Sequence, residues 1–187
     1  MSRKTDRTMT GPLRPTSALA TLVLAPVLAS GCGGSGSLPP QQYPAAAEQL
    51  VSATDLRRLD ATSPAYAVMA WWRDTQFNDR AGYLRHLTRA IRLRLDESQV
   101  DRQLPILAAG IRTAKPEILS TEFAAGDATV YTKIAFRQPI GATRYVTTTR
   151  PQAFHLVRVA GTWRLADTSF ADSMTAAALS AMHKADS

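Results

Sequence analysis

The apolar side chains of residues 45–112 recur every three or four positions, which is the period of an amphipathic helix. The expected helices are 45–59, 64–77, 80–90 and 97–111. Ser63 and Pro64 mark the start of the second helix, because serine caps a helix and proline fits its first turn. Residues 91–95 also alternate between apolar and polar side chains, so the pattern leaves a helix and a strand open there.

From residue 117 onward the pattern changes to alternation, with many valine, isoleucine, threonine and aromatic residues. The expected strands are 117–123, 127–138, 144–159 and 162–168. Short turns at Gly126 and Gly161 favour antiparallel pairing of consecutive strands, and Pro151 favours an edge or a bulge in the third. A short helix over 171–184 completes the pattern. Residues 45–187 are therefore expected to form one α+β domain, helices first.

Three packing patterns lie between residues 64 and 170. They are the AVMAWW run at 67–72, the helix break at Asn78-Asp79, and the closing hairpin FHLVRVAGTWRL at 154–165. Together they resemble the cone-shaped domains of the nuclear transport factor 2 superfamily. The resemblance implies N-terminal helices packed into a strongly curved antiparallel sheet. The superfamily includes ketosteroid isomerases and SnoaL-like cyclases, so it also implies a pocket inside the cone.

Acid–base chemistry in such a pocket would use carboxyl, imidazole or phenol side chains. The candidates are Asp74, Asp79, His86, Tyr131 and His155. Asp79 follows the helix break, where an aspartate ordinarily caps the next helix. His155 lies on the opposite side of its strand from Phe154, so it lines the pocket if that side is concave and is a surface group otherwise.

Two neighbouring tryptophans stand out in the second helix. Adjacent helical side chains point about 100° apart, so at most one of Trp71 and Trp72 is expected to centre on the core. Trp72 is taken as core wall or pocket lining, and the other ring as partly exposed. In the closing hairpin, Trp163 and Leu165 are expected on one buried face.

The N-terminus carries a different kind of signal. Four basic residues precede a twelve-residue apolar run at 18–29, which as a helix would span about 18 Å and so fall short of a bilayer core of about 30 Å. The run ends in Leu-Ala-Ser-Gly before Cys32, which is the one cysteine of the chain. This arrangement resembles the lipobox of bacterial lipoproteins. It implies that residues 1–31 are a cleaved signal peptide and that Cys32 carries the lipid. An ordinary secretory signal is the alternative.

Residues 32–44 are then the lipidated cysteine and a tether, because the segment is rich in glycine, serine and proline. The first 31 residues carry four basic groups and one aspartate, so without them the net charge falls from +7 to about +4. That smaller excess weakens a nucleic-acid function. No metal-ligand spacing and no phosphate loop occurs in the sequence, so no metal or cofactor is expected.

The sequence therefore predicts a lipid-anchored protein on the extracytoplasmic side of a bacterial membrane. Its domain would bind or assemble with an envelope protein or an apolar small molecule, without catalytic residues. The alternative is an isomerase- or cyclase-type enzyme acting on a hydrophobic molecule in the cone pocket. Arg85, Arg89 and Arg92 would form one basic stripe on a continuous helix. That stripe is either a solvated face or a contact with anionic lipid headgroups.

Overall fold

The computed structural model describes residues 45–140 and 143–185. The predicted signal peptide at 1–31, Cys32 and the tether up to residue 44 lie outside the described residues. Among the helices described, none has the length and apolar character needed to cross a bilayer.

Polar side chains set the starts of most helices. The elements are a 3-10 helix η1 (Ala45–Ala47) and the α-helices α1 (Ala53–Arg57), α2 (Pro64–Gln76), α3 (Arg80–Arg85), α4 (Arg89–Arg94), α5 (Glu97–Ile111) and α6 (Ser169–Ala185). Ser52, Ser63, Asp79, Thr88 and Asp96 cap α1 to α5 in turn. The predicted single helix over 45–59 is wrong, because the capping box at Ser52 starts α1 separately from η1.

Four antiparallel strands follow in chain order. They are β1 (Ala114–Ala124), β2 (Asp127–Ile140), β3 (Arg144–Val159) and β4 (Thr162–Leu165). The turns at Ala125-Gly126 and Ala160-Gly161 have positive φ at both positions, which matches the twist of tight hairpins. Only Leu156–Val159 of β3 pair with β4. Along the rest of β3, no described strand pairs with its second edge, and this is why Pro151 fits there without losing a ladder bond.

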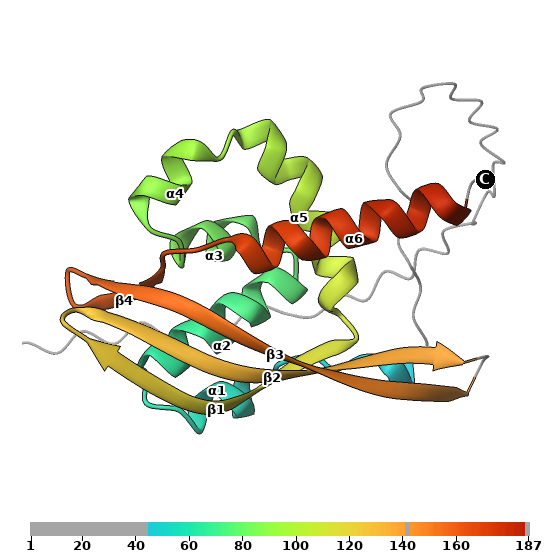
Figure 1. Cartoon of the computed structure of the whole chain (residues 1–187), viewed down its shortest axis with the longest axis horizontal. Coiled ribbons are helices and arrows are strands. Elements are labelled where there is room, and N and C mark those ends of the chain that lie inside the picture. The colour runs from blue at the N-terminus through green and yellow to red at the C-terminus, as the bar shows by residue number, and fades with distance from the viewer. Residues whose placement is uncertain (1–44, 141–142, 186–187) are drawn as a thin grey trace, which may run out of the picture. The chain divides into compact units, whose positions relative to one another are not determined.

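The prediction of a cone of the nuclear transport factor 2 type is wrong. The structure is a four-stranded antiparallel meander, and Figure 1 shows helices on both sides of the sheet, with α1 beside β1 and α3 to α6 on the other side. The patterns used for the prediction are packing patterns. Any sheet with one buried face next to an amphipathic helix produces them. The order of helices before strands is as expected, but it does not define a cone.

An aromatic cluster forms the centre of the core. Trp71 and Trp72 are 2% and 0% exposed, so the expectation that one ring would be partly exposed is wrong. Trp71 lies 5.9 Å from Phe154 of β3 and 6.1 Å from Tyr83 of α3, between ring centroids. Trp72 lies 5.3 Å from Phe170 of α6. The sheet and α6 both pack against α2, so two faces of this helix are buried and both tryptophans lie in the core.

Candidate functional site

The most enclosed group of ionisable side chains joins α2 to α3. Asp74 is 9% exposed, and its Oδ2 lies 3.0 Å from His86 Nε2 and accepts a hydrogen bond of 3.0 Å from Arg85 Nη2. Arg73 Nη1 is 3.9 Å from the other carboxylate oxygen. Burial acts to raise the pKa of Asp74. The hydrogen bond with His86 and the charges of His86 and Arg85 outweigh burial and hold that pKa below its usual value.

Gly82 allows this cluster to close. A Cβ at this position would lie 2.5 Å from Asp74 Oδ2 and 2.5 Å from Asp79 Oδ2. Asp79 is exposed, and its Oδ1 accepts a hydrogen bond from the Gly82 amide as the N-cap of α3. The structure thus gives Asp79 the role of helix cap that the sequence favours.

A carboxylate beside an imidazole is the arrangement that orients a general base. Such a pair needs a space beside it where a reacting atom can lie. Neither Asp74 nor His86 lines either of the two pockets described below. The pair instead links the end of α2 to the end of α3, where His86 O also accepts a hydrogen bond from Leu165 N of β4.

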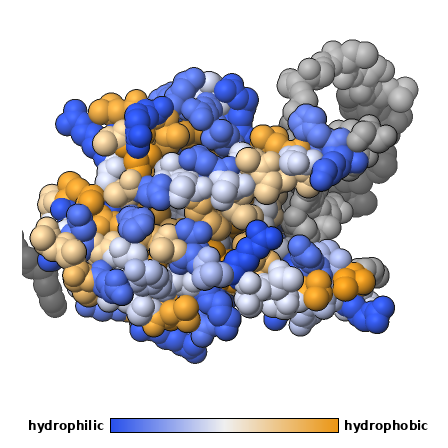
Figure 2. Space-filling model, in the orientation of Figure 1, coloured by the Kyte–Doolittle hydropathy of each residue, from blue (hydrophilic) through white to orange (hydrophobic). Residues whose placement is uncertain are grey.

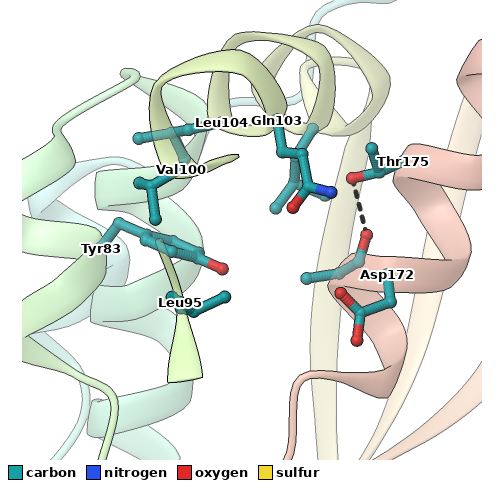
Figure 3. Close-up of a pocket in the computed structure, with 9 residues that line it drawn as sticks. Tyr83, Leu95, Val100, Gln103, Leu104, Asp172 and Thr175 are labelled. Carbon is teal, nitrogen blue, oxygen red and sulfur yellow. Dashed lines mark hydrogen bonds between the residues drawn. The ribbon is translucent and has the colours of Figure 1, made fainter. Parts of the chain in front are cut away.

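The more enclosed of these two pockets lies between α3, α5 and α6. Figure 3 shows the hydroxyl of Tyr83, the amide of Gln103 and the carboxylate of Asp172 around it. Its volume is about 10 Å³, which is the space of roughly one water. Burial and the charge of Asp172 raise the pKa of Tyr83 to about 12, so this phenol stays protonated. A hydrophobic substrate does not fit in this volume.

The second pocket is an open groove between α1 and the edge strand β1, with a volume of about 380 Å³. Asp55 and Lys115 cross one end of it with an ion pair of 2.9 Å. Partial burial acts to raise the pKa of Asp55, but hydrogen bonds from Lys115 and Ser52 lower it to about 2. The groove is lined by both charged and apolar side chains, and Asp55 in it is held ionised by the ion pair with Lys115.

The remaining candidate site residues lie apart from one another and do not form a common site. Trp72 lies in the core, and its Nε1 donates to Ala114 O over 3.2 Å. His155 is exposed, with Nδ1 3.1 Å from Thr129 Oγ1, so of its two possible positions it takes the surface one. Tyr131 is 36% exposed, and its hydroxyl donates to Glu122 over 3.0 Å.

The predicted basic stripe is also absent. Arg85 belongs to α3, whereas Arg89 and Arg92 belong to α4, and the chain turns between the two helices at His86 to Thr88. Among the described residues, no group of three or more histidine, cysteine or acidic side chains could hold a metal ion.

Sequence reasoning missed a buried amide that links distant segments. The side-chain nitrogen of Gln76 donates to Gln49 O, Ile111 O and Ala114 O over 3.0, 2.9 and 2.9 Å. Its side-chain oxygen accepts from Val51 N over 2.9 Å. Gln76 is 2% exposed, so each of these bonds replaces a bond to water. A polar residue at an apolar helical position was the one signal that could have revealed it.

The chain was compared with family models, curated proteins and solved structures. No family model matches the chain, and no curated protein matches it. Among solved structures, the chain is similar to the solution structure of a SEC-C motif containing protein from Rhodopseudomonas palustris. The identity is 14% and the TM-score 0.44, over 59% of this chain and 80% of that one. A likeness at this level carries no functional argument.

The resemblance to the nuclear transport factor 2 superfamily stated above is wrong, because the four-stranded meander with helices on both sides is not the cone that the superfamily implies. The comparisons do not point to that superfamily. They do not identify a lipoprotein either. The lipid attachment at Cys32 lies outside the described residues and rests on the sequence alone.

Proposed function

We propose that the protein is held to the extracytoplasmic face of a bacterial membrane by acyl chains on Cys32, and that its folded unit binds a partner at that surface. One observation carries the proposal. A basic segment, a short apolar run, small residues, the single cysteine and a flexible tether follow each other in the order that export and lipid attachment require.

Acyl chains on the cysteine would be enough for stable attachment. A single acyl chain gives marginal, reversible binding, whereas two chains hold a protein firmly on a bilayer. Residues 33–44 would then act as a spacer, with an r.m.s. reach of about 20 Å for some twelve flexible residues. The folded unit would stay next to the headgroups.

A binding role is supported by what the folded unit offers. Of its two described pockets, one has the volume of about one water and the other is an open groove. The isomerase or cyclase alternative came from the family resemblance, and no observation favours it. We therefore advance the binding function alone, with an envelope protein or the membrane itself as the partner surface.

Replacing Cys32 with alanine tests the anchor. We expect the Cys32→Ala chain to stay unprocessed, with residues 1–31 still attached, because lipid attachment has to precede cleavage in this scheme. The size of the chain on a denaturing gel and the distribution between membrane and soluble fractions are the readouts. Processing of Cys32→Ala at the same rate as the parent chain would show an ordinary secretory signal and refute the anchor.

A further inference from the structure

Strands β2 and β3 continue beyond the core as a two-stranded ribbon. Beyond Phe136, β2 pairs with β3 and with no other described strand. We call this ribbon, together with the exposed stretch of β3 that leads into it, the β2–β3 arm; it comprises Phe136–Ile140 and Arg144–Pro151. Every residue from Arg144 to Pro151 is exposed, on both faces of the strand. Two-stranded ribbons are marginally stable in water on their own. In Figure 1 the arm projects away from α2 and α4, on the side where α6 ends.

The arm is basic and has no acidic residue of its own. Arg137, Arg144 and Arg150 lie on it. None of the three forms an ion pair with any described residue. Two of the guanidinium groups lie over aromatic rings, Arg137 over Tyr145 at 4.5 Å and Arg150 over Phe136 at 5.8 Å. Their positive charge is thus held at the surface without a carboxylate partner among the described residues.

Apolar side chains accompany these charges. Ile140 is 53% exposed and Val146 is 42% exposed. The register pairs Ile140 with Arg144, and Gln138 with Val146, so these two apolar residues share one face of the ribbon with Arg144 and Arg150. Arg137 pairs with Thr147 and lies on the other face. Figure 2 shows orange and blue residues side by side at this end of the molecule.

The arm also lies next to the point where the described chain begins. Arg137 Nη1 donates to Ala46 O over 3.1 Å, and Arg137 N donates to Thr113 O over 2.7 Å. The described chain begins at Ala45, the residue before Ala46, and the predicted tether ends at residue 44. With a tether reach of about 20 Å, the base of the arm would remain close to a lipid on Cys32.

We propose that the β2–β3 arm docks on anionic lipid headgroups of the membrane to which Cys32 is attached. This proposal rests on the proposed function. Arg144 and Arg150 would contact phosphate groups, and Ile140 and Val146 on the same face would enter the region between headgroups and acyl chains. Each arginine near an anionic surface increases binding about fivefold, so loss of two would weaken docking on the order of 25-fold.

The test uses the lipid-anchored protein in vesicles. With Cys32 acylated, Val146→Cys introduces a single reactive thiol on the arm for a polarity-sensitive fluorophore. Leu93→Cys on α4 is the matched site, because Leu93 is also an exposed apolar residue and Figure 1 places α4 far from the arm. Emission is compared in phosphatidylglycerol and phosphatidylcholine vesicles, and flotation of the vesicles reports attachment separately.

We expect a blue shift at the Val146→Cys site in phosphatidylglycerol vesicles and none at the Leu93→Cys site. The shift should disappear at about 1 M salt, where the screening length falls to about 3 Å. It should also be lost when Arg144→Gln and Arg150→Gln are combined, but kept with Arg89→Gln and Arg92→Gln on α4, which remove the same charge elsewhere.

The other outcomes overturn the proposal in distinguishable ways. Protein that floats with the vesicles but gives equal emission at both sites has an anchor without a docking arm. A shift in phosphatidylcholine that grows with protein density would show contact between copies of the chain. A shift caused by added double-stranded DNA and not by phosphatidylglycerol would assign the arm to nucleic acid. Protein that fails to float has no lipid anchor, and the proposed function then fails together with this proposal.

Discussion

Gln76→Glu tests the buried amide most sharply, because it keeps the shape of the side chain and replaces its N–H donors with an ionisable carboxyl oxygen. The substitution removes the nitrogen that donates to three backbone carbonyls, Gln49 O, Ile111 O and Ala114 O. A buried group left without its partner costs about 1–3 kcal/mol. Ala114 O keeps the bond from Trp72 Nε1, so two carbonyls lose their side-chain donor. We expect a loss of about 4 kcal/mol, a large share of a typical total of 5–15 kcal/mol.

The loss should depend on pH in a defined direction. Carbonyl oxygens around the new carboxyl disfavour its charged form, so its pKa in the folded state is raised. The penalty is then greatest at pH 8 and decreases as the pH falls toward about 4, the range in which the unfolded side chain also takes up a proton. Thermal melts at several pH values measure this, with Gln99→Glu in the first turn of α5 as the control. A melting temperature within about 3 °C of the parent at pH 8 would refute the reasoning.

Three further substitutions test the packing. Gly82→Ala should destabilise the protein by about 1–2 kcal/mol in urea unfolding, although alanine ordinarily favours a helix, because its Cβ would meet the carboxylates of Asp74 and Asp79; a gain in stability would contradict this geometry. Asp74→Asn should cost most at neutral pH. Its effect should shrink below about pH 4, since a lowered carboxyl pKa stabilises the folded state only while the group is ionised. Trp163→Ala should cost about 3 kcal/mol, because the ring is 7% exposed, and an unchanged melt would refute the hairpin register.

Local sequence signals were enough to place most elements. Ser63 and Pro64 locate the start of α2, and the alternation from residue 127 locates β2. Trp163 and Leu165 share a buried face, as alternation requires, with 7% and 2% exposure. These features depend on residues close in sequence, which is why a pattern can reveal them.

The features that the hydrophobic pattern failed to predict depend on tertiary contacts. Trp71 is buried because α6 supplies Phe170 from about 100 residues further along the chain, at a ring distance of 6.5 Å. The helical stripe through Arg85 and Arg89 fails because the chain turns at His86, where Asp74 and β4 hold the residue in place. Periodicity within one helix contains no information about either partner.

The candidate site also combines features set by residues close in sequence with features set by tertiary contacts. The sequence names Asp74 and His86 as separate residues, but it does not show that they meet, since their contact depends on the turn between α2 and α3. Whether His155 faced a pocket depended on which face of β3 packs against α2 and α6, and that face carries Phe154 instead. The basic character of the arm is visible in the sequence, because residues 135–151 contain Arg137, Arg144 and Arg150 and no acidic residue.

The most direct test of the account is mass spectrometry of the N-terminal peptide of the protein isolated from membranes of its native host. We predict a peptide that begins at Cys32 and carries the added mass of two acyl chains on a glycerol, with or without a third chain on the amine. An unmodified Cys32, or a mature N-terminus at any other residue, would contradict the lipid anchor and the membrane docking that follows from it.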